Sequence, residues 1–90
     1  MTQAADVNDQ LQRASEVQHK YADRLMSLPH VIGVAIGYVM ERGERKPEIG
    51  LVVMVDEKLP EAQLSPDAIV PHEIEGVRVD VQEQGAFFAH

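Results

Sequence analysis

Cysteine and tryptophan are absent from this 90-residue chain, which has only two tyrosines and two phenylalanines. Without cysteine there can be no disulfide framework, thiolate zinc site, iron–sulfur cluster or cysteine nucleophile. The same absence fits a reducing compartment, and we expect a cytoplasmic protein. No apolar run approaches the roughly 20 residues that span a bilayer, and the first ten residues lack the basic and apolar regions of a secretory signal. The sequence therefore predicts no membrane partner.

Positive charge is also scarce, because 15 acidic residues face 8 lysines and arginines and give a formal net charge of −7. Residues 1–47 hold six acids and six bases, so the whole excess lies in residues 48–90. The one cluster of bases, at Arg42, Arg45 and Lys46, is surrounded by glutamates. That mixture is more typical of a solvated hairpin tip than of an anion-binding loop. With few aromatic rings for base stacking as well, the sequence predicts no nucleic-acid partner.

Ninety residues allow a single domain, 1–90, and an apolar content of 44% is enough for a packed core. Residues 6–28 predict one long helix, because apolar residues recur there at spacings of three and four and form one stripe. Pro29 ends this helix, since proline disfavours helical geometry in the residue before it. The stripe consists of Val7, Leu11, Ala14, Val17, Tyr21, Leu25 and Leu28.

Residues 31–56 predict a β-hairpin with a turn at 41–47. In residues 31–40, bulky even positions alternate with a small face at Gly33, Ala35 and Gly37. Glycine inside a strand usually marks close approach of another segment. We therefore expect Gly33 and Gly37 to be packing positions, with the long helix as the first candidate for the segment that lies against them. Residues 49–56 are nearly all apolar, which indicates cover on both faces.

Residues 57–76 predict a crossover with one short helical turn, and they end at Gly76, where glycine allows a turn with positive φ. Residues 77–83 alternate cleanly and predict a strand, followed by a tail at 84–90. The expected fold class is α+β, with the order α-β-β-short α-β. A long N-terminal helix packs on a small, mainly antiparallel sheet of three strands, and 77–83 lies beside the first strand of the hairpin.

Candidate catalytic residues lack the sequence context that their chemistry needs. None of Ser15, Ser27 and Ser65 sits in a strand–turn–helix elbow. The histidines show neither HxxxH nor HExxH spacing. We therefore predict no enzyme, no cofactor and no metal. One alternative stays open, which is a small-ligand or metal-binding domain that uses His30, His72 and nearby carboxylates.

From Leu28 onward the order of motifs resembles a small module that precedes trypsin-like serine peptidase domains in many bacterial proteins. The matching segments are Leu28–Gly37, Gly50–Val55, the Lys58-Leu59-Pro60 turn and Ile69–Val81. Ala35 departs from the pattern, since the module often has glycine there. The resemblance covers roughly two thirds of the chain, and the residues that carry it are glycines, prolines and valines.

In that family a peptidase domain with its His, Asp and Ser follows the module, whereas this chain ends at His90, so no member of the triad is assigned here. The resemblance implies an accessory or interaction module without hydrolase activity. We expect its partner to be a protein or a second copy of the chain, with a homodimer favoured. Such a dimer would form through an edge strand, the helix or the tail residues Phe87 and Phe88, because exposed apolar groups usually mark an interface.

Overall fold

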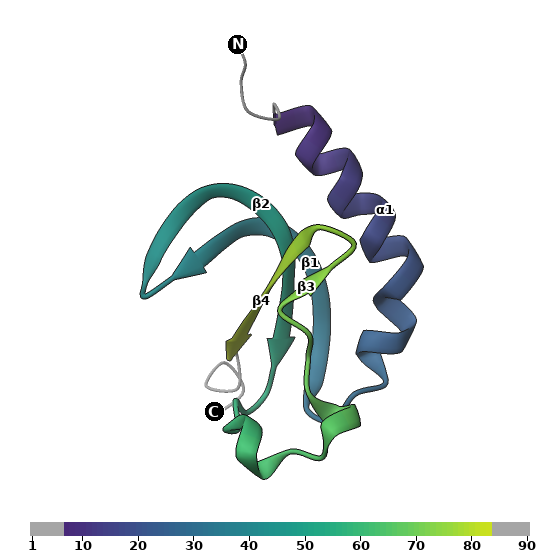
Figure 1. Ribbon diagram of the computed structural model, residues 1–90, viewed down its shortest axis with the longest axis vertical. Helices are drawn as coiled ribbons and strands as arrows, with labels where there is room; N and C mark the ends of the chain where they lie inside the picture. The colour runs from purple at the N-terminus through teal and green to yellow at the C-terminus, as the bar shows by residue number, and fades with distance from the viewer. Residues whose placement is uncertain (1–6, 84–90) are drawn as a thin grey trace, which may run out of the picture.

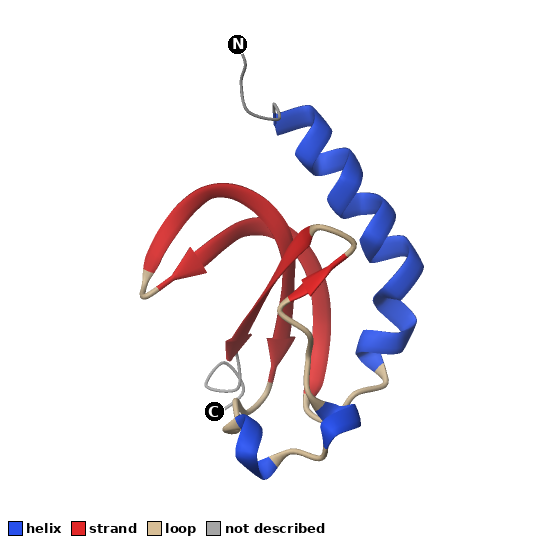
Figure 2. Cartoon of the chain, viewed as in Figure 1, coloured by secondary structure: helices blue, strands red, loops and turns tan. Residues whose placement is uncertain are grey.

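The computed structural model describes residues 7–83 of the chain. One long helix, α1 (Val7–Met26), precedes a hairpin of two long strands, β1 (Val31–Glu41) and β2 (Glu44–Val55). Two 3-10 turns follow, at Glu61–Gln63 and Pro66–Ala68, and then the short strand β3 (Glu73–Ile74) and the strand β4 (Val77–Glu83). Figure 2 shows the helix alongside one sheet. The predicted α+β class is confirmed.

Helix α1 follows the predicted stripe only in part, because Ala14, Val17 and Leu25 are buried against the sheet whereas Val7 and Leu11, near its start, are exposed. It ends at Met26, two residues before the predicted end. The Ser27 hydroxyl donates to the Arg24 carbonyl at 2.6 Å, and the Leu28 N–H donates to the Leu25 carbonyl at 3.1 Å. These bonds satisfy part of the helix end just before Pro29, as a helix terminus requires.

The hairpin turn is tighter than predicted. Arg42 and Gly43 take left-handed φ values of 54° and 82°, and the flanking Glu41 and Glu44 are paired across the strands. Two consecutive left-handed residues are typical of a two-residue hairpin turn. The turn expected over residues 41–47 therefore shortens to two residues, and β2 begins at Glu44 rather than at residue 49.

The predicted strand arrangement is wrong in two respects. The sheet has four strands in the order β1-β2-β4-β3, so it is mixed rather than mainly antiparallel. Strand β4 lies parallel to β2, with Leu51 beside Val79 and Val53 beside Val81, and not beside the first strand. Because β2 is central, its side chains are covered on both sides, and Leu51 and Val53 are fully buried.

The two faces of the sheet differ in side-chain size. Val34 and Ile36 of β1 share the face of Leu51 and Val53, and they pack in the core that includes Ala14 and Val17 of α1. The helix therefore covers the bulky face, which corrects the expectation that it lies against the small one.

The opposite, open face carries the small residues of β1 beside the larger side chains of β2. A Cβ atom on Gly33 would lie 2.7 Å from Met54 Cε, and one on Gly37 would lie 3.4 Å from Val52 Cγ2. Neighbouring side chains of β2, rather than another layer, therefore meet this face at both glycines.

The outer part of the β1–β2 hairpin bends away from α1 and arches over the open face (Figure 1). The Met40 N–H donates to Asp80 Oδ2 at 3.0 Å and links this part of β1 to β4. At the base of the arch, Gly50 lies against the backbone carbonyl of Arg78, and a Cβ there would collide with that oxygen. Gly50 was not among the glycines singled out from the sequence, although its contact is the tightest of these.

Candidate functional site

His30 and His72, the candidate ligands, line the same cavity of about 250 Å³ between the crossover and the end of the sheet. His30 Nδ1 lies 2.9 Å from Asp56 Oδ1, and His72 Nε2 lies 3.0 Å from Glu61 Oε2. Each imidazole is thus paired with a different carboxylate. The apolar part of the cavity wall includes Val55, Leu59 and Leu64 near the crossover, Val79 and Val81 of β4, and Val39 and Met40 of β1.

Within residues 7–83 there is no group of three or more histidine and acidic side chains placed to hold one ion. His30 and His72, each paired with a carboxylate, lie in a cavity with both charged and aliphatic walls, and they can bind a small molecule by hydrogen bonds while its body contacts the aliphatic part.

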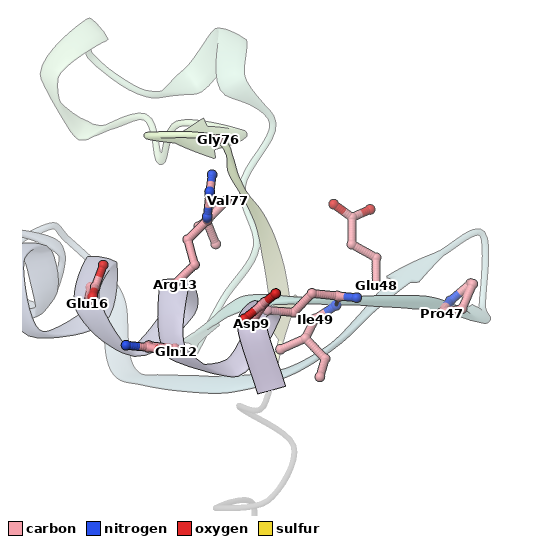
Figure 3. A pocket seen from close by; sticks show the side chains of 10 residues that line it. Asp9, Gln12, Arg13, Glu16, Pro47, Glu48, Ile49, Gly76 and Val77 are labelled. Carbon is pink, nitrogen blue, oxygen red and sulfur yellow. Dashed lines mark hydrogen bonds between the residues drawn. The ribbon is translucent and has the colours of Figure 1, made fainter. Parts of the chain in front are cut away.

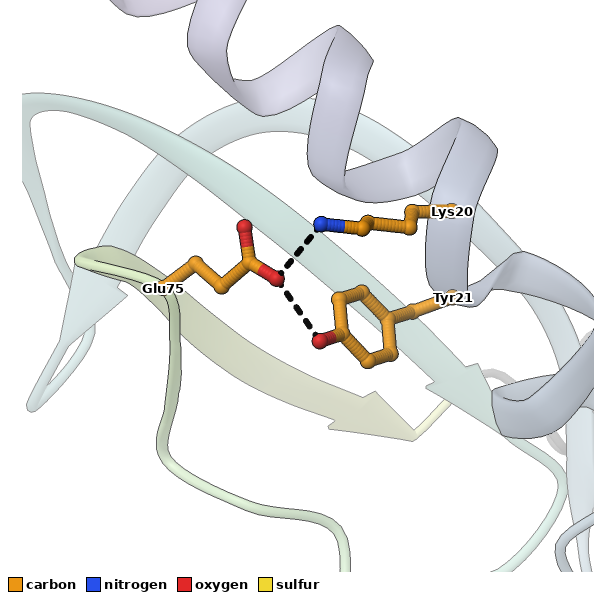
Figure 4. A network of polar contacts seen from close by, with 3 residues as sticks. All are labelled: Lys20, Tyr21 and Glu75. Atoms are coloured by element: carbon orange, nitrogen blue, oxygen red, sulfur yellow. Dashed lines mark hydrogen bonds and ion pairs between the residues drawn. The ribbon is translucent and has the colours of Figure 1, made fainter.

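A second polar cluster links α1 to the turn between β3 and β4 (Figure 4). Glu75 Oε2 accepts hydrogen bonds from Lys20 Nζ at 3.0 Å and from the Tyr21 hydroxyl at 2.8 Å. Glu75 and Gly76 have φ values of 51° and 83°, so the turn is left-handed at both positions and presents the carboxylate to the helix. The positive φ of Gly76 is the conformation expected from the sequence.

The cluster shifts the proton affinity of all three groups. The hydrogen bond from Lys20, followed by that from Tyr21, lowers the pKa of Glu75 below its ordinary value. The same bonds to Glu75 raise the pKa of Lys20 and of Tyr21. Because the Lys20 and Glu75 side chains are 64% and 45% exposed, water screens the pair, and we interpret the cluster as an attachment of the turn rather than as a reactive site.

An open groove of about 590 Å³ lies between the first half of α1 and the strands (Figure 3). Its lining mixes signs, with Arg13 beside Asp9, Glu16 and Glu48. Arg13 extends toward Gly76, where its Nη1 would lie 3.4 Å from an added Cβ. A groove with both signs of charge along its wall has no clear preference for an anion or a cation.

The exposed large apolar side chains of the described chain belong to two elements that contact each other, α1 and β1. In the part of the chain that the structure describes, six large apolar residues are exposed by 38% to 49%, and all six belong to α1 or β1. We call them the α1–β1 surface, which consists of Val7, Leu11, Met26, Ile32, Tyr38 and Met40. The sequence predicted an interface through the helix, an edge strand or the tail, but it did not predict this set of residues.

The geometry between α1 and β1 indicates where this surface lies. Gln18 Nε2 donates to the Val34 carbonyl at 3.0 Å. Val7 and Leu11 precede Gln18 at spacings of eleven and seven, so they share its side of the helix. At Gln18, α1 therefore meets β1, which is an edge strand of the sheet, whereas at Gln10 it meets β2, whose Ile49 N–H donates to Gln10 Oε1 at 2.8 Å.

The structure describes the bases of the hairpin tip but not the two tail phenylalanines. At the hairpin tip, the Arg45 guanidinium lies 4.7 Å from the Tyr38 ring centre, and Lys46 Nζ lies 3.9 Å from Glu44 Oε1, so these bases have local partners. Phe87 and Phe88 lie outside the described residues.

No known family model matches this chain, and no curated protein matches it. The resemblance to the peptidase-associated module thus stays a prediction from motif order. No helix among residues 7–83 is long and apolar enough to cross a bilayer.

Proposed function

We propose that this protein is a non-catalytic interaction module that binds a protein partner through the α1–β1 surface. The observation that carries the proposal is the gathering of all six exposed large apolar side chains of the described region on two adjacent elements. Scattered apolar residues are ordinary on a protein surface, whereas a gathered set usually marks an interface.

The charge distribution favours a protein over a polyanion at this surface. Residues 7–40 contain three acids, Asp9, Glu16 and Asp23, and three bases, Arg13, Lys20 and Arg24. A neutral surface gives no electrostatic attraction to phosphate groups. Because β1 is at the edge of the sheet, it also offers backbone hydrogen-bonding groups that another protein strand would satisfy.

Site-specific photocrosslinking in the cells that make the protein tests this proposal. A photoreactive residue replaces Met26, which is on the surface, or Ala62, an exposed control in the first 3-10 turn. We expect a discrete protein adduct at position 26, either with another copy or with a different chain, and none at position 62. The absence of a protein adduct at position 26, or equal labelling at both positions, would contradict the proposal.

A second candidate function is binding of a small ligand or a metal in the cavity of His30 and His72. The observation in its favour is that the structure brings both histidines to one cavity. Zinc chloride is a direct probe, since an ion that binds only the folded state stabilises it by about 2.7 kcal/mol at 100 times its dissociation constant. We expect the melting temperature to stay unchanged with zinc. A rise that is lost in His30→Ala and His72→Ala would favour this candidate instead.

A further inference from the structure

The outer edge of β1 lacks charge and proline, two features that commonly prevent strands from pairing, although Gln18 of α1 binds its Val34 carbonyl and its register is irregular near both ends. Among the described strands, β1 pairs through its backbone with β2 alone. Residues 31–40 contain no charged residue and no proline over ten positions. Proteins commonly protect such edges with lysine, proline or a very short strand. The other edge, β3, is only two residues long. Of the two edges, β1 is therefore the one suited to pair with another strand.

The sequence of this edge is nearly symmetric in side-chain size. Around Ala35, Val34 matches Ile36, Gly33 matches Gly37, Ile32 matches Tyr38, and Val31 matches Val39. An antiparallel strand related by a twofold axis at Ala35 would place Val34 opposite Ile36 and Gly33 opposite Gly37, within the stretch of β1 that lies between its two register irregularities. Bulky side chains would then meet bulky ones on one face of the sheet, and glycine would meet glycine on the other.

We propose that the occupant of this edge is a second copy of the chain, paired antiparallel along β1 with a twofold axis at Ala35. This inference rests on the proposed function and names its partner. In a twofold contact, the same patch of both copies meets, so the patch must be complementary to itself. A strand whose side-chain sizes are symmetric about its centre meets this condition. The two four-stranded sheets then become one continuous sheet, and the α1 helices lie on the same face of it.

The backbone pattern is consistent with this register. In an antiparallel strand, alternate residues direct their N–H and C=O groups toward the same neighbour. The Val34 carbonyl accepts a hydrogen bond from Gln18 of α1, so the Val34 groups are directed to the outer edge, and those of Ile36 with them. In the dimer Val34 exchanges hydrogen bonds with Ile36 of the second copy. Ala35 then lies opposite Ala35 of the second copy, in the closely spaced, non-hydrogen-bonded arrangement.

Charge also favours a second copy. The excess of acids lies in residues 48–90, on segments that follow β1 in the chain. Among the strands, β4 and β3 lie beyond β2 from the open edge. Pairing through β1 therefore joins the two neutral halves and keeps the acidic strands of the two copies apart, which limits repulsion between two chains of formal charge −7.

Introducing a charge at Ala35 tests both the identity of the partner and the register of the pairing. Ala35 is partly exposed on the face that α1 does not cover, so a longer side chain has space there. We expect the wild type to sediment at about twice 10.0 kDa at tens of micromolar. Ala35→Lys or Ala35→Glu alone puts like charges opposite each other and should weaken association at least about tenfold. An equimolar mixture of the two variants should form a mixed dimer.

The matched controls, Ala62→Lys and Ala62→Glu, make the same charge changes at an exposed residue of the crossover and should dimerise like the wild type. Circular dichroism establishes that each Ala35 variant is folded. If either one is not, Ile32→Lys replaces it, because it puts a charge at an exposed apolar position of the same edge, and this variant should be monomeric.

A wild-type chain that sediments as a monomer would overturn this inference, and so would folded Ala35 variants that dimerise normally or fail to form a mixed dimer. These results are separable from failure of the proposed function. A monomer whose position 26 still crosslinks to a different protein removes the second copy but keeps the interaction module. A monomer without a crosslink at position 26 removes both.

Discussion

Replacing Gly50 by alanine adds a methyl group at the point where β2 meets the backbone of β4. The new Cβ would collide with the Arg78 carbonyl oxygen and would lie 3.2 Å from Val39 Cγ2. A flexible side chain could move away, but the carbonyl belongs to the strand that is paired in parallel with β2 from Leu51 to Val55. Relief therefore requires displacement of β4, the strand that supplies Val77 and Val79 to the core.

The expected cost is about 3 kcal/mol, the upper part of the usual range for overpacking a well-packed site. For a domain of this size, each kcal/mol lowers the melting temperature by about 4–8 °C, so Gly50→Ala should melt about 12–24 °C below the wild type. The matched control is Gly37→Ala, whose Cβ makes an ordinary contact of 3.4 Å with Val52. The control should stay within about 1 kcal/mol of the wild type, because lower chain entropy in the unfolded state offsets small strain.

Thermal unfolding followed by far-ultraviolet circular dichroism measures both variants under the same conditions. The reasoning is refuted if Gly50→Ala melts within about 2 °C of the wild type, or if Gly37→Ala is the more damaging of the two. Either result would mean that β4 does not approach β2 at Gly50 as closely as the structure has it.

Three further predictions concern other parts of the fold. Because the lowered pKa of Glu75 favours its ionised form in the folded state, its stabilisation is present above the ordinary carboxyl pKa of about 4.3 and is lost as pH falls through the lowered value. Glu75→Gln should therefore have a lower free energy of unfolding than the wild type at pH 7, and the difference should disappear in acid. The exposed control Glu57→Gln should unfold like the wild type. A Glu75→Gln difference that stays constant at every pH would contradict this. Gln18→Ala frees the Val34 carbonyl at the edge of β1. The variant should associate more tightly in sedimentation runs and should lose about 1 kcal/mol of folding stability. Weaker association would count against the proposed register. Leu51→Ala removes a fully buried side chain of the central strand and should cost about 2–5 kcal/mol in urea unfolding; a loss below 1 kcal/mol would mean that Leu51 is not central to the core.

The helix and the strands β1 and β4 were predictable because each has a clear periodicity, and the second half of β2 was predictable from its continuous apolar run. The stripe on α1, the alternation in β1 and that in β4 all report which side of an element is buried. Strand β3 escaped prediction because two residues, Glu73 and Ile74, are too few to show any period.

The neighbour of β4 was predicted wrongly for a different reason. Alternation along Val77–Glu83 shows which face is covered but not which strand lies alongside. The continuous apolar run of β2 did contain the information, since cover on both faces is typical of a central strand with a parallel neighbour. Placing β4 beside β2 would have followed from that run.

The candidate site was predictable only in part. The sequence singled out His30 and His72, but their approach to one cavity depends on the path of the crossover. The contact of Glu75 with Lys20 and Tyr21 joins residues 54 and 55 positions apart and leaves no local pattern. The small face was recognised correctly as a pattern, yet the pattern does not say that the helix packs on the other side.

Amide hydrogen exchange at Ile36, resolved by nuclear magnetic resonance, tests most directly the claim that the β1 edge is where this protein meets its partner. In the proposed dimer the Ile36 N–H is hydrogen-bonded to Val34 of the second copy, so its exchange should slow as the protein concentration rises from about 1 to about 100 micromolar across the expected association range. The amide of Val53, on the central strand β2, should change little and serves as the internal reference. Exchange at Ile36 that stays fast and independent of concentration would contradict the account.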